Sequence, residues 1–219
     1  MFPVKSTKYL EGPEFWLARL GGRPARGSVH PAELASQIGA ESDLACRPAA
    51  GGMVAPNRFK VRLNGSDLKA LPDHRGLIRD LEAMTEEMSM IRGRRLEGPV
   101  RVWLEPDPGA TPGTIQVDAF HRIGRRRPWA LLIGGGQLLE LRVNRSVLGR
   151  GRSADVAITH QSVSANHALV WYEEDGVWIR DMGSAHGTMV DGRPALGTTR
   201  VRPPDTITLG SVAYELRML

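Results

Sequence analysis

The hydrophobic period of the sequence changes at a short arginine-rich stretch, and this change limits the folds that the chain can adopt. Before residue 121, segments with apolar residues every three or four positions alternate with segments of period two, which predicts helices mixed with strands. After Pro128, short period-two segments follow one another between glycine- and proline-rich turns, as in an all-β sandwich. The pattern predicts an α+β domain at 1–120, a basic linker at 121–128 and an all-β sandwich at 129–219.

The segment before residue 121 carries signals for both kinds of element. Pro31 is tolerated as a first helical residue, and Leu34 and Ile38 follow it on one face, which predicts a short amphipathic helix at 31–39. From 58 to 63, apolar and basic residues alternate, as in a strand with one buried and one solvated face. The other predictions are a short helix capped by Ser66 and Asp67 and ending before Pro72, a longer helix with a core stripe of Leu77, Leu81, Met84, Met88 and Ile91 and acidic residues between them, and half-buried strands at 100–104 and 115–119 joined by a Pro/Gly-rich loop at 106–113.

The positive charge of the chain is concentrated in the arginine-rich stretch. Without the four arginines at 122 and 125–127, the net charge falls from +5 to +1. A single cluster followed by Pro128 is typical of a solvated linker, whereas a polyanion-binding face needs a broader basic patch. A nucleic-acid binder that uses the α+β domain and this stretch stays an alternative. Against it, the basic strand has Phe59 as its one aromatic residue, and no Gly-x-x-Gly loop separates the predicted helices.

Several features favour a cytoplasmic protein. No apolar run approaches the roughly 18 residues that a membrane helix needs, so membrane insertion is not expected. The first residues, Met1 to Lys5, lack the basic-then-apolar pattern of a secretory signal. Cys46 is the one cysteine of the chain, so no internal disulfide can form.

Three motifs rich in glycine, serine and histidine lie in the predicted loops of the sandwich. They are, in chain order, Gly149-Arg150-Gly151, Ser164-Ala165-Asn166-His167 and Asp181-Met182-Gly183-Ser184-Ala185-His186-Gly187-Thr188. Together they resemble the forkhead-associated (FHA) domain, and the resemblance extends over residues 128–219. It implies a β-sandwich that binds phosphothreonine on a partner protein through loops at one end.

The residue types in these motifs suit a phosphate group. A phosphomonoester carries about −1.5 to −2 charges at pH 7 and three strong acceptor oxygens, so hydrogen-bond donors must converge on it. Arg150 can offer a fork of N–H donors, and Ser164 can offer a hydroxyl. The resemblance implies that these two side chains contact the phosphate, that Ala165, Asn166, Ala185 and His186 complete the phosphopeptide site, and that Gly149, His167, Gly187 and Thr188 hold its loops in place.

The loop before Gly187 departs from the usual FHA pattern. Most members carry asparagine where this chain has His186, and many carry threonine where it has Ala185. By resemblance, that asparagine hydrogen-bonds the ligand backbone just beyond the phosphothreonine. The donor and acceptor nitrogens of a neutral histidine point away from each other, so they cannot both serve one backbone group as an asparagine amide can, and weaker or altered peptide selectivity is expected. The alternative is a phosphate-independent assembly scaffold with a degenerate site.

No motif predicts an enzyme, a metal site or a cofactor. Ser164 lies three residues before His167, as a nucleophile and its base might be spaced, but the equivalent histidine of FHA domains is structural. No His/Cys/Asp cluster has metal-ligand spacing, and the motif around Arg150 lacks the further glycine and helix of a dinucleotide fingerprint. We predict no catalytic residue, no metal, no cofactor and no small-molecule substrate.

The first domain resembles the domain that precedes FHA in FhaA-type bacterial regulators. The matching residues are 29–35, 55–63 and the strands within 99–120. The resemblance implies a protein that acts beside bacterial Ser/Thr kinases and the cell-wall or division machinery. The expected partner is a phosphothreonine-containing protein, such as a kinase, a pseudokinase or a kinase substrate, and a nucleic-acid partner is not expected.

Overall fold

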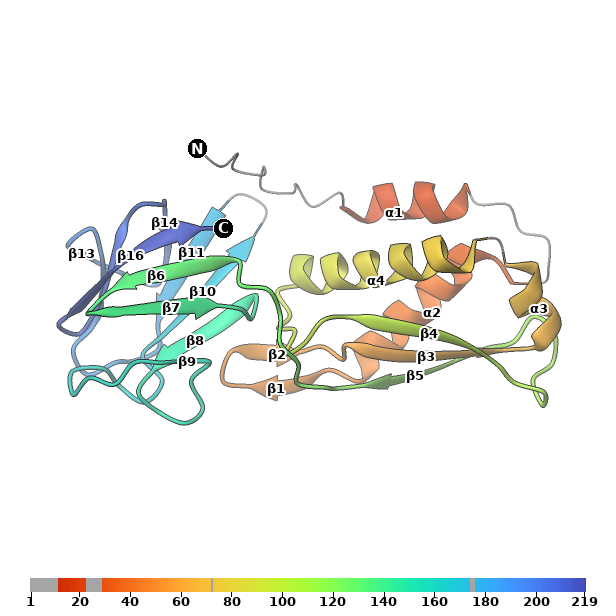
Figure 1. The fold of residues 1–219 in the computed structure, drawn as a ribbon, viewed down its shortest axis with the longest axis horizontal. Helices are drawn as coiled ribbons and strands as arrows, with labels where there is room; N and C mark the ends of the chain where they lie inside the picture. Colours follow the sequence, from red (N-terminus) through yellow and green to blue (C-terminus); the bar gives the residue numbers. More distant parts are fainter. Residues whose placement is uncertain (1–11, 23–28, 72, 174–175) are drawn as a thin grey trace. The chain divides into compact units, whose positions relative to one another are not determined.

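The computed structural model describes residues 12–22, 29–71, 73–173 and 176–219 (Figure 1). These residues fall into two compact units. One comprises residues up to Pro48 and Met53–Gly124, and the other comprises Ala49–Gly52 and Arg125–Leu219. The junction at Gly124 and Arg125 falls inside the segment 121–128, while the domain boundaries given above stay predictions.

The first unit is an α+β fold, as the sequence predicts. Its helices are α1 (Gly12–Gly21), α2 (Pro31–Leu44), α3 (Gly65–Ala70) and α4 (His74–Ile91). Strands β1 (Arg47–Ala49) and β2 (Gly52–Val54) pair with each other, and β3 (Arg58–Leu63), β4 (Arg101–Pro106) and β5 (Ile115–Phe120) form a three-stranded sheet. None of the described helices is long and apolar enough to span a membrane.

The three-stranded sheet is buried on one face. Phe59, Val61 and Leu63 of β3 are fully buried, which confirms the predicted alternation, and α2 and α4 pack on this side. The predicted strands at 100–104 and 115–119 are present, but they lie on opposite sides of β3. β4 is parallel and β5 antiparallel to β3, so the loop between them passes the end of the central strand. In that loop the Asp107 N–H donates to the Leu63 carbonyl at 2.7 Å.

The helices differ from the predictions in detail. α2 begins at Pro31 as predicted, with His30 and Glu33 forming a capping box. It continues beyond residue 39 to Leu44, with Ser42 buried in its added turn. The cap of α3 is Asn64, whose side chain accepts from the Ser66 N–H, so the prediction of Ser66 or Asp67 as cap is wrong.

Asp67 lies inside α3 and is buried. Its carboxylate accepts from the Gly113 N–H at 2.7 Å and so holds the loop between β4 and β5. In α4, Leu77, Leu81 and Met84 are buried, but Ile91, the last residue of the predicted stripe, is 38% exposed.

The acidic residues of α4 are not all solvated. Glu87 accepts from the Trp16 indole N–H at 3.1 Å, and Asp80 forms an ion pair with Arg19 at 2.8 Å. Both carboxylate residues are buried, because α1 packs over α4 (Figure 1). Asp80 and Glu87 therefore mark the contact of α4 with α1.

The second unit is the predicted all-β sandwich. Its six-stranded sheet has the order β13 (Arg193–Pro194), β12 (Thr188–Val190), β15 (Thr206–Leu209), β16 (Val212–Met218), β6 (Ala130–Gly134), β7 (Gln137–Leu141). Its five-stranded sheet has the order β14 (Thr198–Val201), β11 (Gly176–Asp181), β10 (Ala168–Glu173), β8 (Arg145–Gly149), β9 (Val156–Ala157). The described part of 129–219 contains strands and turns but no helix.

Residues from both sheets of the sandwich share one core. Val170 and Ile179 of the five-stranded sheet are fully buried against Leu132, Ile207 and Leu216 of the six-stranded sheet. Each large apolar side chain removed from water stabilises the fold by roughly 1.5–3 kcal/mol. The shared core therefore holds in place the strands from which the loops emerge.

The arginine-rich segment is hydrogen-bonded at both of its ends. The Arg122 N–H donates to Oδ1 of the buried Asn57 at 2.8 Å, and the Gly124 N–H donates to the Glu97 carbonyl at 3.0 Å. Residues 122–124 therefore belong to the first unit. In the second unit, the Arg142 guanidinium donates to the Arg126 carbonyl at 2.6 Å.

Candidate functional site

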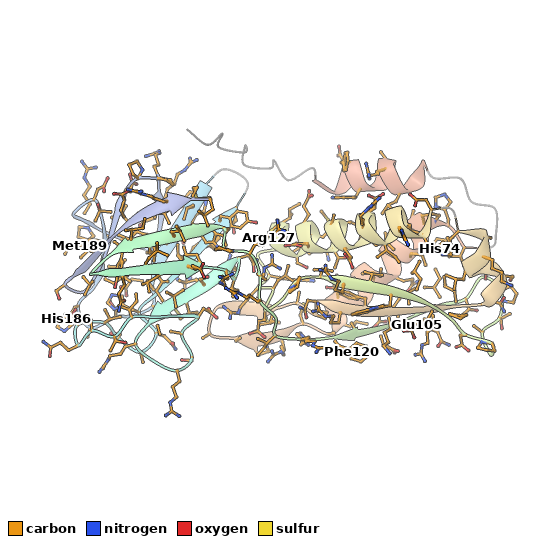
Figure 2. The ribbon with its side chains drawn as sticks, viewed as in Figure 1. His74, Glu105, Phe120, Arg127, His186 and Met189 are labelled. Atoms are coloured by element: carbon orange, nitrogen blue, oxygen red, sulfur yellow. The ribbon has the colours of Figure 1, made fainter. Side chains whose placement is uncertain are left out.

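The three loop motifs meet at one end of the sandwich. Arg150 N–H donates to the Ser164 carbonyl and Gly151 N–H to the Ala165 carbonyl, both at 2.9 Å, which joins the loop after β8 to the loop before β10. The loop between β11 and β12 joins them where the Ala185 N–H donates to Ser164 Oγ at 3.0 Å. His186 of this third loop is labelled in Figure 2.

Gly149 allows the first two loops to approach. A Cβ atom at this position would lie 2.2 Å from the Ala165 carbonyl oxygen, far inside a van der Waals contact. Its role is therefore one of space, and no left-handed backbone conformation is involved. Any side chain here would push the Arg150 and Ser164 loops apart.

Arg150 is exposed at the centre of this loop cluster. Its Nε donates to the Val163 carbonyl at 3.2 Å, which orients the guanidinium. No described residue pairs with its two terminal nitrogens. The guanidinium thus keeps the two-pronged donor edge that suits a phosphate or carboxylate.

Ser164 is held with its hydroxyl proton available. Because Oγ accepts from the Ala185 N–H, the hydroxyl hydrogen is not needed for that contact and can be donated to a ligand. The Ser164 carbonyl is at the same time bound by Arg150 N–H. These two contacts place the serine hydroxyl and the arginine guanidinium on neighbouring, mutually bonded loops.

His167 braces two loops and is fully buried. Its Nδ1 accepts from the Ser164 N–H at 3.0 Å, and its Nε2 lies 3.0 Å from the Gly187 carbonyl. These partners assign a neutral ring with the proton on Nε2. Both ring nitrogens are used by backbone groups, so neither contacts the Ser164 hydroxyl as a general base would.

Asp181 organises the third loop, a role that the sequence analysis missed. Its carboxylate accepts from the backbone N–H groups of Gly183 and Ser184, both at 2.8 Å, and from the hydroxyls of Ser184 and Thr188 at 2.7 and 2.6 Å. Burial alone would raise the pKa of the Asp181 carboxyl, but the bonds from Thr188, Ser184 and Gly183 together outweigh burial and lower it. The signal in the sequence is an aspartate two residues before a glycine, which is typical of an Asx turn.

The remaining candidate residues surround this cluster. Ala165, Ala185 and His186 are exposed, and Asn166 Oδ1 accepts from the Ser153 hydroxyl at 2.8 Å. The His186 side chain has no hydrogen-bond partner among the described residues. Their contribution to peptide binding stays a prediction. The described residues also contain no group of three or more His, Cys, Asp and Glu side chains that could hold a metal ion.

Comparison with known proteins identifies both units. The family model of the FHA domain matches residues 146–210, and that of the FhaA N-terminal domain matches residues 19–118. Comparison with curated proteins gave no match.

Several solved FHA structures are similar to the second unit. The FHA domain of CT664 from Chlamydia trachomatis is 24% identical over 42% of this chain and 98% of its own, with a TM-score of 0.39. The FhaA FHA domain, solved in complex with the intracellular domain of Rv3910, is 24% identical over 40% of this chain and 99% of its own, with a TM-score of 0.37. Mycobacterium tuberculosis Rv1747 FHA-1 is 20% identical over 42% and 97%, with a TM-score of 0.36. By the family models, residues 19–118 match an FhaA N-terminal domain and residues 146–210 an FHA domain that follows it.

Proposed function

We propose that this protein is a phosphothreonine-dependent adaptor whose FHA domain binds a phosphorylated partner through Arg150 and Ser164. The observation that carries the proposal is the placement of an unpaired guanidinium edge and a serine hydroxyl with a free proton on two loops bonded to each other. Both are donors, and a phosphate group needs converging donors. Each charge-assisted bond contributes about 1.5–3 kcal/mol, which suits a moderate and reversible affinity.

The proposed partner is a protein phosphorylated on threonine by a bacterial Ser/Thr kinase. The kinase itself, a pseudokinase or a kinase substrate in cell-wall or division control fits this class. The match of the first domain to the FhaA N-terminal domain supports this partner class, because the resemblance to FhaA-type regulators implies a role beside bacterial Ser/Thr kinases. The adaptor would join such a partner to whatever its first domain binds, without catalysing a reaction.

The direct test compares three degenerate peptide libraries that differ only in a fixed central threonine, phosphothreonine or phosphoserine. We expect the full chain to bind the phosphothreonine library, measured by fluorescence anisotropy, and to bind the unphosphorylated library at least tenfold more weakly. Equal binding of all three would contradict the adaptor and favour the phosphate-independent scaffold.

A pair of arginine variants tests the assigned contact. Arg150→Ala should weaken phosphothreonine binding at least tenfold, because one charge-assisted bond of about 1.5–3 kcal/mol corresponds to that factor or more. Arg217→Ala removes an equal charge from an exposed position on β16 and should leave binding unchanged. If Arg150→Ala binds as the wild type does, Arg150 is not the phosphate contact.

A further inference from the structure

The solvated face of the three-stranded sheet combines basic and aromatic side chains. We call it the outer face, and define it by the residues that alternate with the buried ones: Arg58, Lys60 and Arg62 on β3, Arg101, Trp103 and Glu105 on β4, and Gln116, Asp118 and Phe120 on β5. In sequence, the basic strand has Phe59 as its one aromatic residue, and Phe59 is buried in the core. The strand order supplies two other aromatic rings from the neighbouring strands.

Those rings are open to solvent on either side of the basic strand. Trp103 is 42% exposed and lies opposite Lys60. Phe120, which is labelled in Figure 2, is 46% exposed and lies opposite Arg58. With strands about 4.8 Å apart and a rise of about 3.3 Å per residue, the two aromatic positions are about 12 Å apart on one diagonal. This spacing leaves room for a few nucleotides of an extended strand.

The charges of the outer face are unbalanced. It carries four cationic side chains and two carboxylates. Arg62 is paired with Asp118 at 2.7 Å, and Lys60 lies 3.9 Å from Glu105 at a half-exposed site where such a pair contributes little. Arg58 donates to the carbonyls of Asn57 and Pro99, and no described carboxylate is paired with it.

Arg58 is the centre of a group of guanidinium ions. The pKa of Arg58 is lowered first by burial and then by the positive charges of Arg101 and Arg122, against which Glu82 acts in the opposite direction. Arg101 contacts Glu82 at 3.4 Å, so the carboxylate that acts on Arg58 is already paired with another arginine. An anion arriving at this corner of the sheet would relieve the repulsion, and Phe120 lies directly beside it.

We propose that the outer face binds single-stranded nucleic acid. Phosphate groups would lie against the Arg58, Arg101 and Arg122 corner and Lys60, and unstacked bases would lie on Phe120 and Trp103. Proteins that bind single strands with little sequence preference place aromatic rings beside a basic groove. Each base stacked on such a ring contributes about 1–3 kcal/mol to the binding free energy, whichever base it is. A duplex keeps its bases stacked on each other, so it could use only the cations.

Fluorescence anisotropy of labelled oligothymidine, oligouridine and a matched DNA duplex tests the proposal on the full chain. We expect both single strands to bind more tightly than the duplex at low salt. Trp103→Ala and Phe120→Ala should each weaken single-strand binding by about five- to 160-fold, the range that corresponds to one lost stack. Lys60→Gln should lower the slope of log affinity against log salt by about 0.7, as expected for one lost phosphate contact.

Tryptophan fluorescence gives a second measurement. Trp103 is the exposed member of the five tryptophans, so an oligonucleotide stacked on it should quench emission, and Trp103→Ala should abolish that quenching. Leu196→Ala, an exposed apolar change in the FHA domain, is the matched control and should change neither signal. Arg150→Ala should also leave oligonucleotide binding intact, which separates this site from the phosphothreonine site.

Two results would overturn the proposal. The first is the absence of single-strand binding at low salt, which would leave an acidic protein surface as the occupant of the face. The second is binding that survives both aromatic substitutions but is lost when Arg125, Arg126 and Arg127 are changed to glutamine, because the arginine-rich segment and not the sheet would then hold the strand.

Discussion

Ser164 Oγ accepts the backbone N–H of Ala185 at 3.0 Å, and this one bond connects the loop that carries the proposed phosphate contact to the loop that carries Ala185 and His186. The bond fixes the position of the oxygen and leaves the hydroxyl proton for a ligand. Together with His167, whose ring joins the Ser164 N–H to the Gly187 carbonyl, this bond couples the two halves of the site.

Ser164→Ala should weaken phosphothreonine binding by about tenfold or more, because it removes a donor to a charged group that contributes about 1.5–3 kcal/mol. It also leaves the Ala185 N–H without its acceptor. Isothermal titration calorimetry with a phosphopeptide selected from the phosphothreonine library measures the change in dissociation constant. Ser211→Ala is the matched control, since its hydroxyl lies 3.0 Å from the Ser162 hydroxyl and neither residue belongs to the proposed site, and it should bind nearly as the wild type does. Equal losses in the two variants would show a general effect on the loops.

His167→Ala should destabilise the FHA domain by about 2–4 kcal/mol, because it opens a cavity at a fully buried side chain and leaves the part-buried Ser164 N–H unpaired. The Gly187 carbonyl keeps a second donor, the Gly210 N–H at 3.1 Å, so the cost arises mainly on the Ser164 side. Urea unfolding measures the free energy of unfolding.

His167→Gln offers both a donor and an acceptor and should recover part of the stability lost in His167→Ala. A glutamine variant as unstable as the alanine variant would mean that ring packing, and not the two hydrogen bonds, is what His167 supplies.

The lowered pKa of Asp181 makes part of the stability of the domain depend on pH. A carboxyl whose folded pKa lies below its unfolded value contributes stability that is fully present above the unfolded pKa of about 3.9, and that is lost as the pH falls through the folded pKa. Asp181→Asn should therefore cost about 1 kcal/mol at pH 7, after allowing for solvent screening, and progressively less below pH 4. Unfolding midpoints at several pH values measure this. A difference in unfolding midpoint between the wild type and Asp181→Asn that does not change with pH would contradict this prediction.

His186→Asn should strengthen phosphopeptide binding several-fold, because the asparagine amide presents a donor and an acceptor side by side to one backbone group, whereas the donor and acceptor nitrogens of a neutral imidazole point away from each other. The side chain is exposed and makes no hydrogen bond to a described residue, so the fold should not change. A library screen of both proteins shows whether the preferred residues after the phosphothreonine change. Identical affinity and identical selectivity would exclude His186 from the ligand contact.

The sequence was sufficient for the features that depend on local pattern. The alternation in β3 predicts which of its side chains are buried, and Pro31 predicts the first residue of α2. The loop motifs around Arg150, Ser164 and Gly187 predict the FHA domain, because their order and spacing reflect the same strand connections that the structure shows. At the start of α3, both Asn64 and Ser66 are residue types that can cap a helix, and the sequence pattern alone predicted the wrong one.

Contacts between distant segments required the tertiary structure. The acidic residues Asp80 and Glu87 look solvated in the sequence of α4 but are buried, because their partners Arg19 and Trp16 come from a helix far away in the chain. The bond from Ala185 to Ser164 likewise joins residues on separate loops.

The outer face of the sheet shows the same division most clearly. Local period determined that Lys60 is solvated, but only the strand order decided that Trp103 and Phe120 lie on either side of the basic strand. A side-chain period is set by the geometry of one strand, whereas the identity of the neighbouring strand depends on how the intervening chain packs and closes. The sequence thus determined which side chains face solvent, and the fold decided which of them act together.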